Sequence, residues 1–119
     1  MEENAKIFRS EDSLEKQTKI LSDLRDKYQN VTISDKGKVF NTELLEAIEL
    51  EYLLDMSDTT VASALHRKES RGAHSRVDHV ERDDKNWLKH SFAFKNGDSV
   101  KLEYKDVELG NYEPKERKY

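Results

Sequence analysis

The sequence predicts a mainly α domain: a helical bundle with two long antiparallel helices, followed by a small β-hairpin and an irregular tail. Residues 10–29 and 41–70 contain no glycine or proline and repeat apolar residues every three or four positions, as amphipathic helices do. Residues 88–105 alternate apolar and polar residues around an Asn-Gly-Asp turn, which is typical of a hairpin. A length of 119 residues fits one domain, so we expect residues 1–119 to fold as a single unit.

The first helix is expected to begin at Ser10 or Asp12, because either side chain can accept hydrogen bonds from the free amides of a helix start. Its apolar seam consists of Leu14, Ile20, Leu21, Leu24 and Tyr28. Asn30 is expected to end it. Residues 31–33 then predict a short extended piece, and residues 35–38 predict a turn.

The second helix has a clear start signal. Asn41 is a good N-cap, and Phe40 before it can pack on Leu45 across the cap. Its last turns contain the basic residues Arg67, Lys68 and Arg71. Positive charge is favourable at a helix C-terminus, and Gly72 can take the left-handed conformation that closes a helix.

This second helix carries apolar residues on two faces. One face contains Ala47, Leu50, Leu54, Val61 and Leu65. The other face contains Leu44, Leu45, Ile48, Tyr52 and Met56. An acidic strip of Glu51, Asp55 and Asp58 lies between the two faces. Because the first helix can cover only one face, the other lacks a partner in this chain, and we expect self-association.

The hairpin register follows from the apolar residues of its strands. A two-residue turn at Asn96 and Gly97 would scatter these residues over both faces. A three-residue loop would place them on one face, with the pairs Phe94–Val100, Phe92–Leu102 and His90–Tyr104. We therefore predict the three-residue loop. Before the hairpin, Asp83 or Asp84 can cap a short helical turn that leads to Trp87. The tail, residues 106–119, is too charged to pack as a core element.

Composition excludes several classes of protein. The chain has 21 basic and 25 acidic residues, a net charge of −4, and no strongly basic part, so nucleic acid is not an expected partner. No stretch longer than eight residues lacks a charged residue, so direct membrane insertion is not expected. The absence of cysteine excludes disulfides and thiolate metal sites. The start of the chain lacks the features of a secretory signal, and we expect a cytoplasmic location.

Residues 71–86 form a charged loop in which no catalytic, cofactor-binding or metal-binding residue is predicted. His74 and His79 lie near Asp78, but no standard metal-ligand spacing is present. The basic residues around the loop predict an interface instead, since guanidinium groups bind carboxylates in a bidentate manner. The predicted interface residues are Arg67, Arg71, His74, Arg76, Arg82 and Trp87. Pairing within the domain, with Glu69, Asp78 or Asp83, explains the same pattern equally well.

Two segments near this loop resemble a known family. Residues 67–76 read RKESRGAHSR, and residues 81–90 read ERDDKNWLKH. Further matches, in the same order along the chain, are residues 4–9, NTEL at 41–44 and PKERKY at 114–119. Together they resemble the C-terminal domain of the flavoprotein subunit of succinate dehydrogenase and fumarate reductase. L-Aspartate oxidase carries a similar Ser-Arg-Gly-x-His stretch, but residues 86–90 and the ending of the chain favour the dehydrogenase.

The resemblance implies a helical bundle followed by a small β element, with the first bundle helix truncated, since it would lie before Met1. It implies that an upstream domain binds FAD and the dicarboxylate, so this chain is not catalytic alone and holds no cofactor. The implied partners are that flavin-binding domain and the iron–sulfur subunit, with membrane association only through the parent complex. The alternative is a free-standing helical adaptor, which would have no reason to carry both loop motifs.

Overall fold

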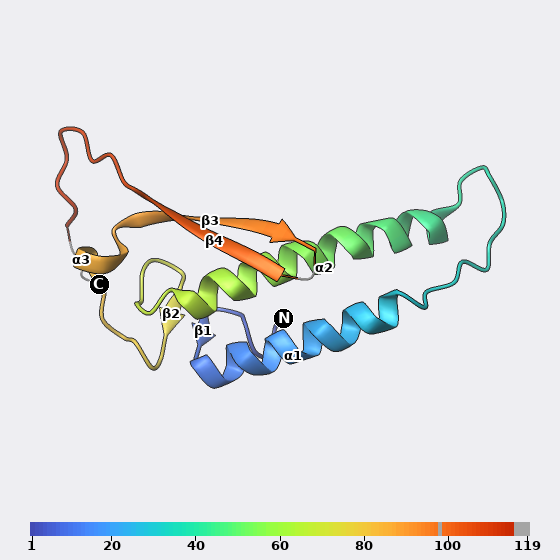
Figure 1. Cartoon of the computed structure of the whole chain (residues 1–119), viewed down its shortest axis with the longest axis horizontal. Coiled ribbons are helices and arrows are strands. Elements are labelled where there is room, and N and C mark those ends of the chain that lie inside the picture. Colours follow the sequence, from blue (N-terminus) through green and yellow to red (C-terminus); the bar gives the residue numbers. More distant parts are fainter. Residues whose placement is uncertain (98, 116–119) are drawn as a thin grey trace.

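Helix α2 (Thr42–His66) lies at the centre of the structure, between helix α1 (Glu11–Tyr28) and a β-hairpin (Figure 1). The structure is a computed structural model that describes residues 1–97 and 99–115. The remaining elements are β1 (Phe8–Arg9), β2 (Ser75–Arg76), α3 (Asp84–Trp87), β3 (Lys89–Asn96) and β4 (Ser99–Asp106). Helices α1 and α2 are antiparallel, and the predicted architecture of two long helices followed by a hairpin is confirmed.

Helix α1 begins at the predicted cap. The Ser10 hydroxyl accepts a hydrogen bond from the backbone N–H of Ser13 (3.2 Å), and the Ser13 hydroxyl accepts one from the N–H of Ser10 (3.0 Å). This reciprocal capping box satisfies two amides that the helix itself leaves unpaired. The helix ends at Tyr28, whose hydroxyl donates to the Ala47 carbonyl of α2 (2.9 Å).

The loop between the helices is held by polar groups rather than by the predicted packing of Phe40 on Leu45. Asn41 is the N-cap of α2, as predicted, since its side chain accepts from the Leu44 N–H (2.8 Å). Phe40, however, is 95% exposed and has a left-handed φ of 51°. That conformation directs the chain into the cap with the ring in solvent, so the predicted staple is wrong. The loop is held instead by Glu43, which accepts from two of its backbone amides.

Helix α2 ends at His66, four residues before the predicted end at residue 70. Arg67 is already extended, with φ −80° and ψ 100°. Gly72 does take a left-handed φ of 58°, but it lies in a separate turn that Arg71 and His74 close with two backbone hydrogen bonds. The helix stops early because the guanidinium of Arg76, ten residues away, binds its last carbonyl groups.

The core lies between α1 and the first apolar face of α2. Its buried apolar residues are Ala5, Leu14, Leu21, Leu54, Val61 and Ala64. Gln17 is also buried, and its side-chain carbonyl accepts from the amide of Asn4 (3.1 Å). Most of this seam matches the predicted one, but Leu24 and Leu50 are each 42% exposed because the core is narrow toward the loop end of the helices.

The second apolar face of α2 has no cover among the described residues. The five residues predicted for this face, Leu44, Leu45, Ile48, Tyr52 and Met56, are between 41% and 65% exposed. The acidic strip beside it is neutralised from two sides. Arg25 of α1 pairs with Asp55 and Asp58 (2.5 and 2.6 Å), and Lys95 of the hairpin also reaches Asp58 (2.8 Å).

The hairpin has a different register from the predicted one. Asn96 pairs with Ser99, so only two residues connect the strands; one of them, Asp98, lies outside the described residues. The pairs along the strands include Phe94–Lys101, Phe92–Glu103 and Ala93–Leu102. Phe92 and Phe94 therefore occupy the outer face, 44% and 48% exposed, rather than sharing a face with Val100 and Leu102. The predicted three-residue loop is wrong.

Polar anchors determine which face of β3 lies on α2. Lys95 binds the acidic strip, and Arg67 donates to the Lys89 carbonyl (2.8 Å) and the Ser91 hydroxyl (3.0 Å). These residues alternate with Phe92 and Phe94, so their attachment turns both rings outward.

The segments predicted as irregular contain few regular elements. No strand is assigned to residues 31–33, and residues 107–115 follow the hairpin without a helix or strand. The end of the PKERKY motif, residues 116–119, lies outside the described residues. Within the described part of the chain, no helix has both the length and the apolar character needed to cross a membrane.

Candidate functional site

An ion pair between a buried arginine and a partly exposed aspartate joins the ends of the two long helices. Arg76 of β2 is fully buried, and its Nε and Nη2 donate to the two carboxylate oxygens of Asp78 (2.7 Å each). Its Nη1 donates to the carbonyls of Ala64 (3.1 Å) and Leu65 (3.2 Å) at the end of α2. Asp78 in turn accepts from the backbone N–H of Glu11, the first residue of α1 (2.8 Å). Each charge therefore lies at the helix end whose dipole it complements.

The Arg76 guanidinium also lowers the proton affinity of the Asp78 carboxylate. Its hydrogen bonds to Asp78 are the main reason that the pKa of this carboxyl lies far below its ordinary value, and the Glu11 N–H acts in the same direction. Asp78 therefore stays ionised throughout the neutral and mildly acidic range.

Glu69 forms a second buried charge cluster. Its side chain is fully buried and accepts from Arg67, from Arg71 (2.9 Å at Nε and at Nη2) and from the backbone N–H of Asp83 (2.9 Å). Burial alone would raise the pKa of Glu69, but these hydrogen bonds outweigh it and hold the pKa below its ordinary value. The cluster fastens the end of α2 to α3, whose N-cap is Asp83, as predicted.

Trp87, next to this cluster, is held by an edge-to-face aromatic contact and by cation–π contacts. Trp87 packs edge-on against Tyr104 of β4, with ring centroids 5.7 Å apart. The guanidinium of Arg67 lies 5.3 Å from the centre of the Trp87 ring, and Lys89 lies 5.9 Å from it. Arg67 thus contacts α3 and the hairpin at the same time.

His74 connects the N-terminal segment to the same network. Its Nδ1 accepts from Arg9 (2.8 Å), since a guanidinium can only donate, and its Nε2–H then donates to the Arg67 carbonyl (3.2 Å). Burial lowers the pKa of His74 below its ordinary 6.5, and the nearby charges of Arg9, Arg76 and Arg67 lower it further. The imidazole is therefore neutral at pH 7, with its proton on Nε2.

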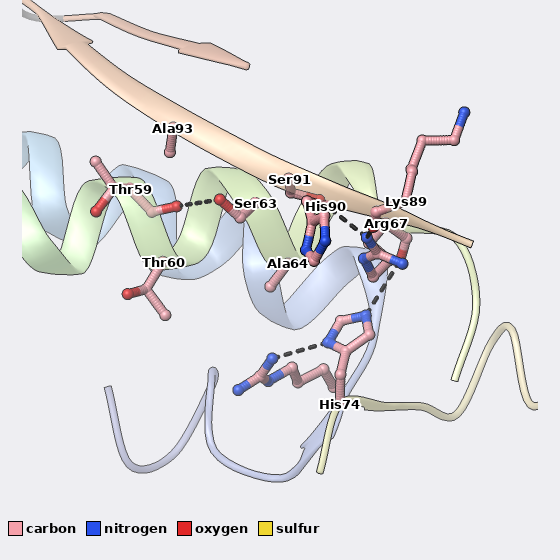
Figure 2. Close-up of a pocket in the computed structure, with 11 residues that line it drawn as sticks. Thr59, Thr60, Ser63, Ala64, Arg67, His74, Lys89, His90, Ser91 and Ala93 are labelled. Atoms are coloured by element: carbon pink, nitrogen blue, oxygen red, sulfur yellow. Dashed lines mark hydrogen bonds between the residues drawn. The ribbon is translucent and has the colours of Figure 1, made fainter. Parts of the chain in front are cut away.

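These groups border an open pocket of about 530 Å³ on α2, between the hairpin and the N-terminal segment (Figure 2). Its basic and imidazole residues are Arg9, Arg67, His74, Lys89 and His90. Its hydroxyl residues are Thr59, Thr60, Ser63 and Ser91, and two alanines complete the lining. Among the residues that the structure describes, no Asp or Glu lines this pocket, although the whole chain has 25 acidic residues.

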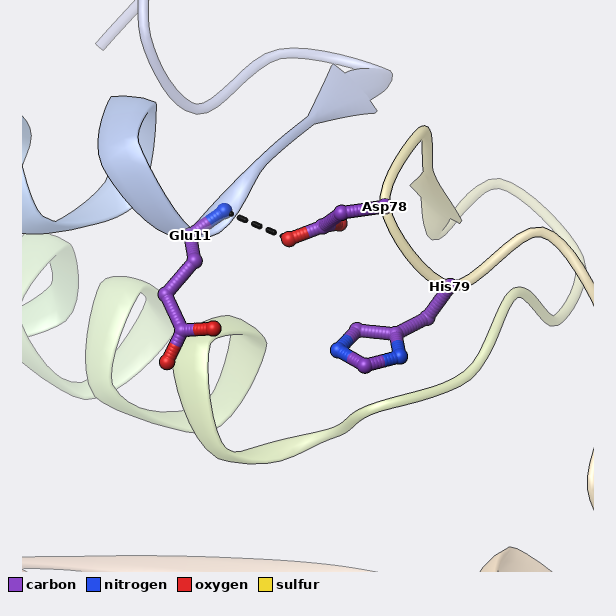
Figure 3. Close-up of side chains that lie close together, drawn as sticks. All are labelled: Glu11, Asp78 and His79. Carbon is purple, nitrogen blue, oxygen red and sulfur yellow. Dashed lines mark hydrogen bonds between the residues drawn. The ribbon is translucent and has the colours of Figure 1, made fainter.

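Three potential metal ligands, Glu11, Asp78 and His79, also lie close together (Figure 3). Both oxygens of Asp78 already accept hydrogen bonds from Arg76, and one of them also accepts from the Glu11 N–H. The cluster is thus explained by the ion pair that joins the helices. Neither His74 nor His79 is in a metal-ligand arrangement with the acidic residues at 81, 83 and 84 among the described residues.

Four of the six predicted interface residues have acidic partners within the chain. Arg76 pairs with Asp78, while Arg67, Arg71 and Arg82 pair with Glu69 or Asp84. His74 and Trp87 are hydrogen-bonded or stacked inside the same network. The geometry thus favours the internal-pairing alternative for the arginines. The interface role of all six stays a prediction.

The sequence did not single out Arg9, Glu69 or Lys89 as site residues. Arg9 meets His74 through the parallel pairing of β1 with β2, in which Arg9 lies opposite Arg76. β1 and β2 have two residues each and lie far apart in the sequence, so their pairing leaves no periodic pattern of apolar residues. Arg9, Glu69 and Lys89 lie within the segments that carry the family resemblance, residues 4–9, 67–76 and 81–90, but the resemblance assigned them no role.

Lowering the pH should destabilise the domain through His74. Unfolded His74 takes up a proton near pH 6.5, whereas the folded state resists it, so stability should fall as the pH drops below 6.5 toward the lower folded pKa. Titration of the His74 ring protons by NMR, assigned with a His74→Asn variant, measures the folded pKa. A midpoint at or above 6.5 would show that the described hydrogen bonds do not keep the imidazole neutral.

Comparison with known proteins gives the family of the chain. The family model described as fumarate reductase flavoprotein C-term matches residues 1–119. The fumarate reductase flavoprotein subunit of Haemophilus influenzae is 42% identical over 120 residues, covering 100% of this chain and 20% of that protein. The mitochondrial succinate dehydrogenase (ubiquinone) flavoprotein subunit of Oryza sativa subsp. japonica is 40% identical, again over 100% and 20%.

Solved structures agree with the sequence comparison. An E. coli quinol fumarate reductase structure aligns with a TM-score of 0.94 at 42% identity, covering 98% of this chain and 20% of that one. A Mycobacterium smegmatis Sdh1 complex aligns with a TM-score of 0.74 at 31% identity, covering 87% and 18%. The chain thus spans 20% of the length of the curated relatives. It belongs to the family of fumarate reductase and succinate dehydrogenase flavoprotein subunits, and it matches their C-terminal domain.

Proposed function

We propose that this domain acts within a flavoprotein subunit that interconverts succinate and fumarate with FAD, where it braces the flavin-binding part and the iron–sulfur subunit. The observation that carries the proposal is the family match along the whole chain, over only 20% of the relatives' length. The flavin and the dicarboxylate then bind to the other 80% of the subunit. The domain contributes a rigid surface rather than reacting groups.

The uncovered face of α2 supports this role. Residues Leu44, Leu45, Ile48, Tyr52 and Met56, called here the α2 stripe, form a continuous apolar surface along one side of the helix. Burying a large apolar side chain contributes roughly 1.5–3 kcal/mol, so a segment of the parent subunit would gain substantially by covering the stripe. A helix that precedes residue 1 is the covering segment that the family resemblance implies.

The six predicted interface residues would act mainly by holding the surface in shape. Arg67, Arg71 and Arg76 fix the end of α2, α3 and the loop between them through Glu69 and Asp78. Every member except Arg76 is partly buried, but Arg82 and Trp87 make no ion pair with the buried Glu69, so we assign the contact with the iron–sulfur subunit to them. His74 would act through Arg9 and the pocket beside it.

The proposal is tested with the full-length subunit that ends in this domain. We expect that subunit to retain FAD and to oxidise succinate or reduce fumarate, and the 119-residue chain alone to do neither. In the same preparation, Arg82→Ala and Trp87→Ala should weaken co-purification of the iron–sulfur subunit, whereas Arg71→Ala should mainly lower thermal stability. A full-length subunit without flavin or dicarboxylate turnover would favour the adaptor alternative.

The 119-residue chain alone should self-associate through the α2 stripe. Light scattering at several concentrations should give a mass above the 14.0 kDa of a monomer. The double variant Tyr52→Glu/Met56→Glu should restore the monomer, because charges on the stripe oppose its burial. The control, Lys19→Glu on the exposed side of α1, changes the net charge equally and should leave association intact. A wild-type chain that stays monomeric at all concentrations would contradict the expectation.

A further inference from the structure

The pocket on α2 combines positive charge with an absence of carboxylates. Arg9 donates to the Lys6 carbonyl (2.6 Å) and to His74 (2.8 Å), but it has no carboxylate partner among the residues that the structure describes. The Lys89 amine, in contrast, lies over the rings of Trp87 and Tyr104 and points away from His74 (Figure 2), and Lys89 pairs with Asp106 across the hairpin. Arg67 is paired with Glu69 and also donates to the hairpin. Arg9 is therefore the cation of the pocket that is available to an acidic partner.

The hydrogen-bond donors of the pocket indicate which type of chemical group it can bind. The hydroxyls of Thr59, Thr60 and Ser63 donate back to carbonyls of α2 itself. The donors that remain for an occupant are those of Arg9, the imidazole of His90 and the Ser91 hydroxyl, which only accepts from Arg67. Such a set matches an anion that accepts several hydrogen bonds, and a carboxylate meets a guanidinium with the right planar geometry.

The size and position of the pocket favour a protein segment over a small free anion. Its volume of about 530 Å³ is several times that of a C4 dicarboxylate, and the pocket is open to solvent along α2. The α2 stripe leads directly into it, because Tyr52, Met56 and Ser63 follow one another at helical spacing on the same face. A segment that covers the stripe would thus arrive at the pocket.

We infer that the pocket receives an Asp or Glu side chain from the part of the flavoprotein subunit that precedes this domain, bound by Arg9. The inference rests on the proposed function, since it takes its partner from the remainder of that subunit. The carboxylate neutralises the charge that Arg9 presents and fixes the register of the segment lying on the α2 stripe. Burial is the main reason that the pKa of His74 is lowered, but the charge of Arg9 lowers it further, and the carboxylate would offset this second effect.

A cryo-electron microscopy structure of the intact subunit tests the inference directly. We expect a carboxylate oxygen from the preceding part of the chain within hydrogen-bond distance of Arg9 in the pocket. A pocket filled by apolar or basic side chains, or left open to solvent in the assembled subunit, would overturn it. An intact subunit without flavin would contradict the proposed function instead. The same cryo-electron microscopy map would still show which side chain occupies the pocket.

Two solution measurements distinguish a carboxylate docked from the preceding part of the subunit from two alternatives. In the first alternative Arg9 acts only within this domain, and in the second the pocket binds a free anion. Arg9→Gln should speed hydrogen exchange at residues 59–67 by about tenfold more in the intact subunit than in the 119-residue chain, while the control Lys6→Gln should not. An equal effect in both would mean that Arg9 acts only through the Lys6 carbonyl and His74.

Titration of the chain with succinate should show no saturable binding below about 10 mM. Saturable binding that Arg9→Gln abolishes would make a free dicarboxylate the occupant and overturn the assignment.

Discussion

The ion pair between Arg76 and Asp78 links the end of α2 to the start of α1 and so determines how the two long helices meet at these ends. Arg76 places a buried positive charge against the last carbonyls of α2, and Asp78 places a negative charge against the first amide of α1. Both charges are favourable at these helix ends, and each neutralises the other. A buried arginine without Asp78 would be costly, so the short segment that carries both residues is fixed in one conformation.

The rest of the site follows from this fixed segment. β2 pairs with β1 and brings Arg9 beside His74, while Glu69 ties Arg67 and Arg71 to α3. The hairpin is then attached at one end by Arg67 and at the other by Lys95. A domain built in this way has few groups free for chemistry. It offers instead a rigid surface with an apolar stripe and a cationic pocket, which suits a brace within a larger flavoprotein subunit.

Features set by neighbouring residues could be predicted from the sequence, and features set by distant polar contacts could not. The caps at Ser10, Asn41 and Asp83 depend on amides two or three positions away, and all three are present. The end of α2 depends on Arg76, and the face of the hairpin depends on pairs such as Lys95 with Asp58. Apolar alternation favoured the wrong register because no local pattern reports these contacts. The pocket could not be predicted for the same reason, since contacts between distant residues form it.

A double-mutant cycle on Arg76 and Asp78 tests the central claim most directly. The free energy of unfolding in urea is measured for the wild-type chain, Arg76→Met, Asp78→Asn and the double variant. We predict that Arg76→Met costs about 3 kcal/mol, and that the double variant is less destabilised than the sum of the single variants by about 1–3 kcal/mol. Additive single effects, or an Arg76→Met variant as stable as the wild type, would contradict the account.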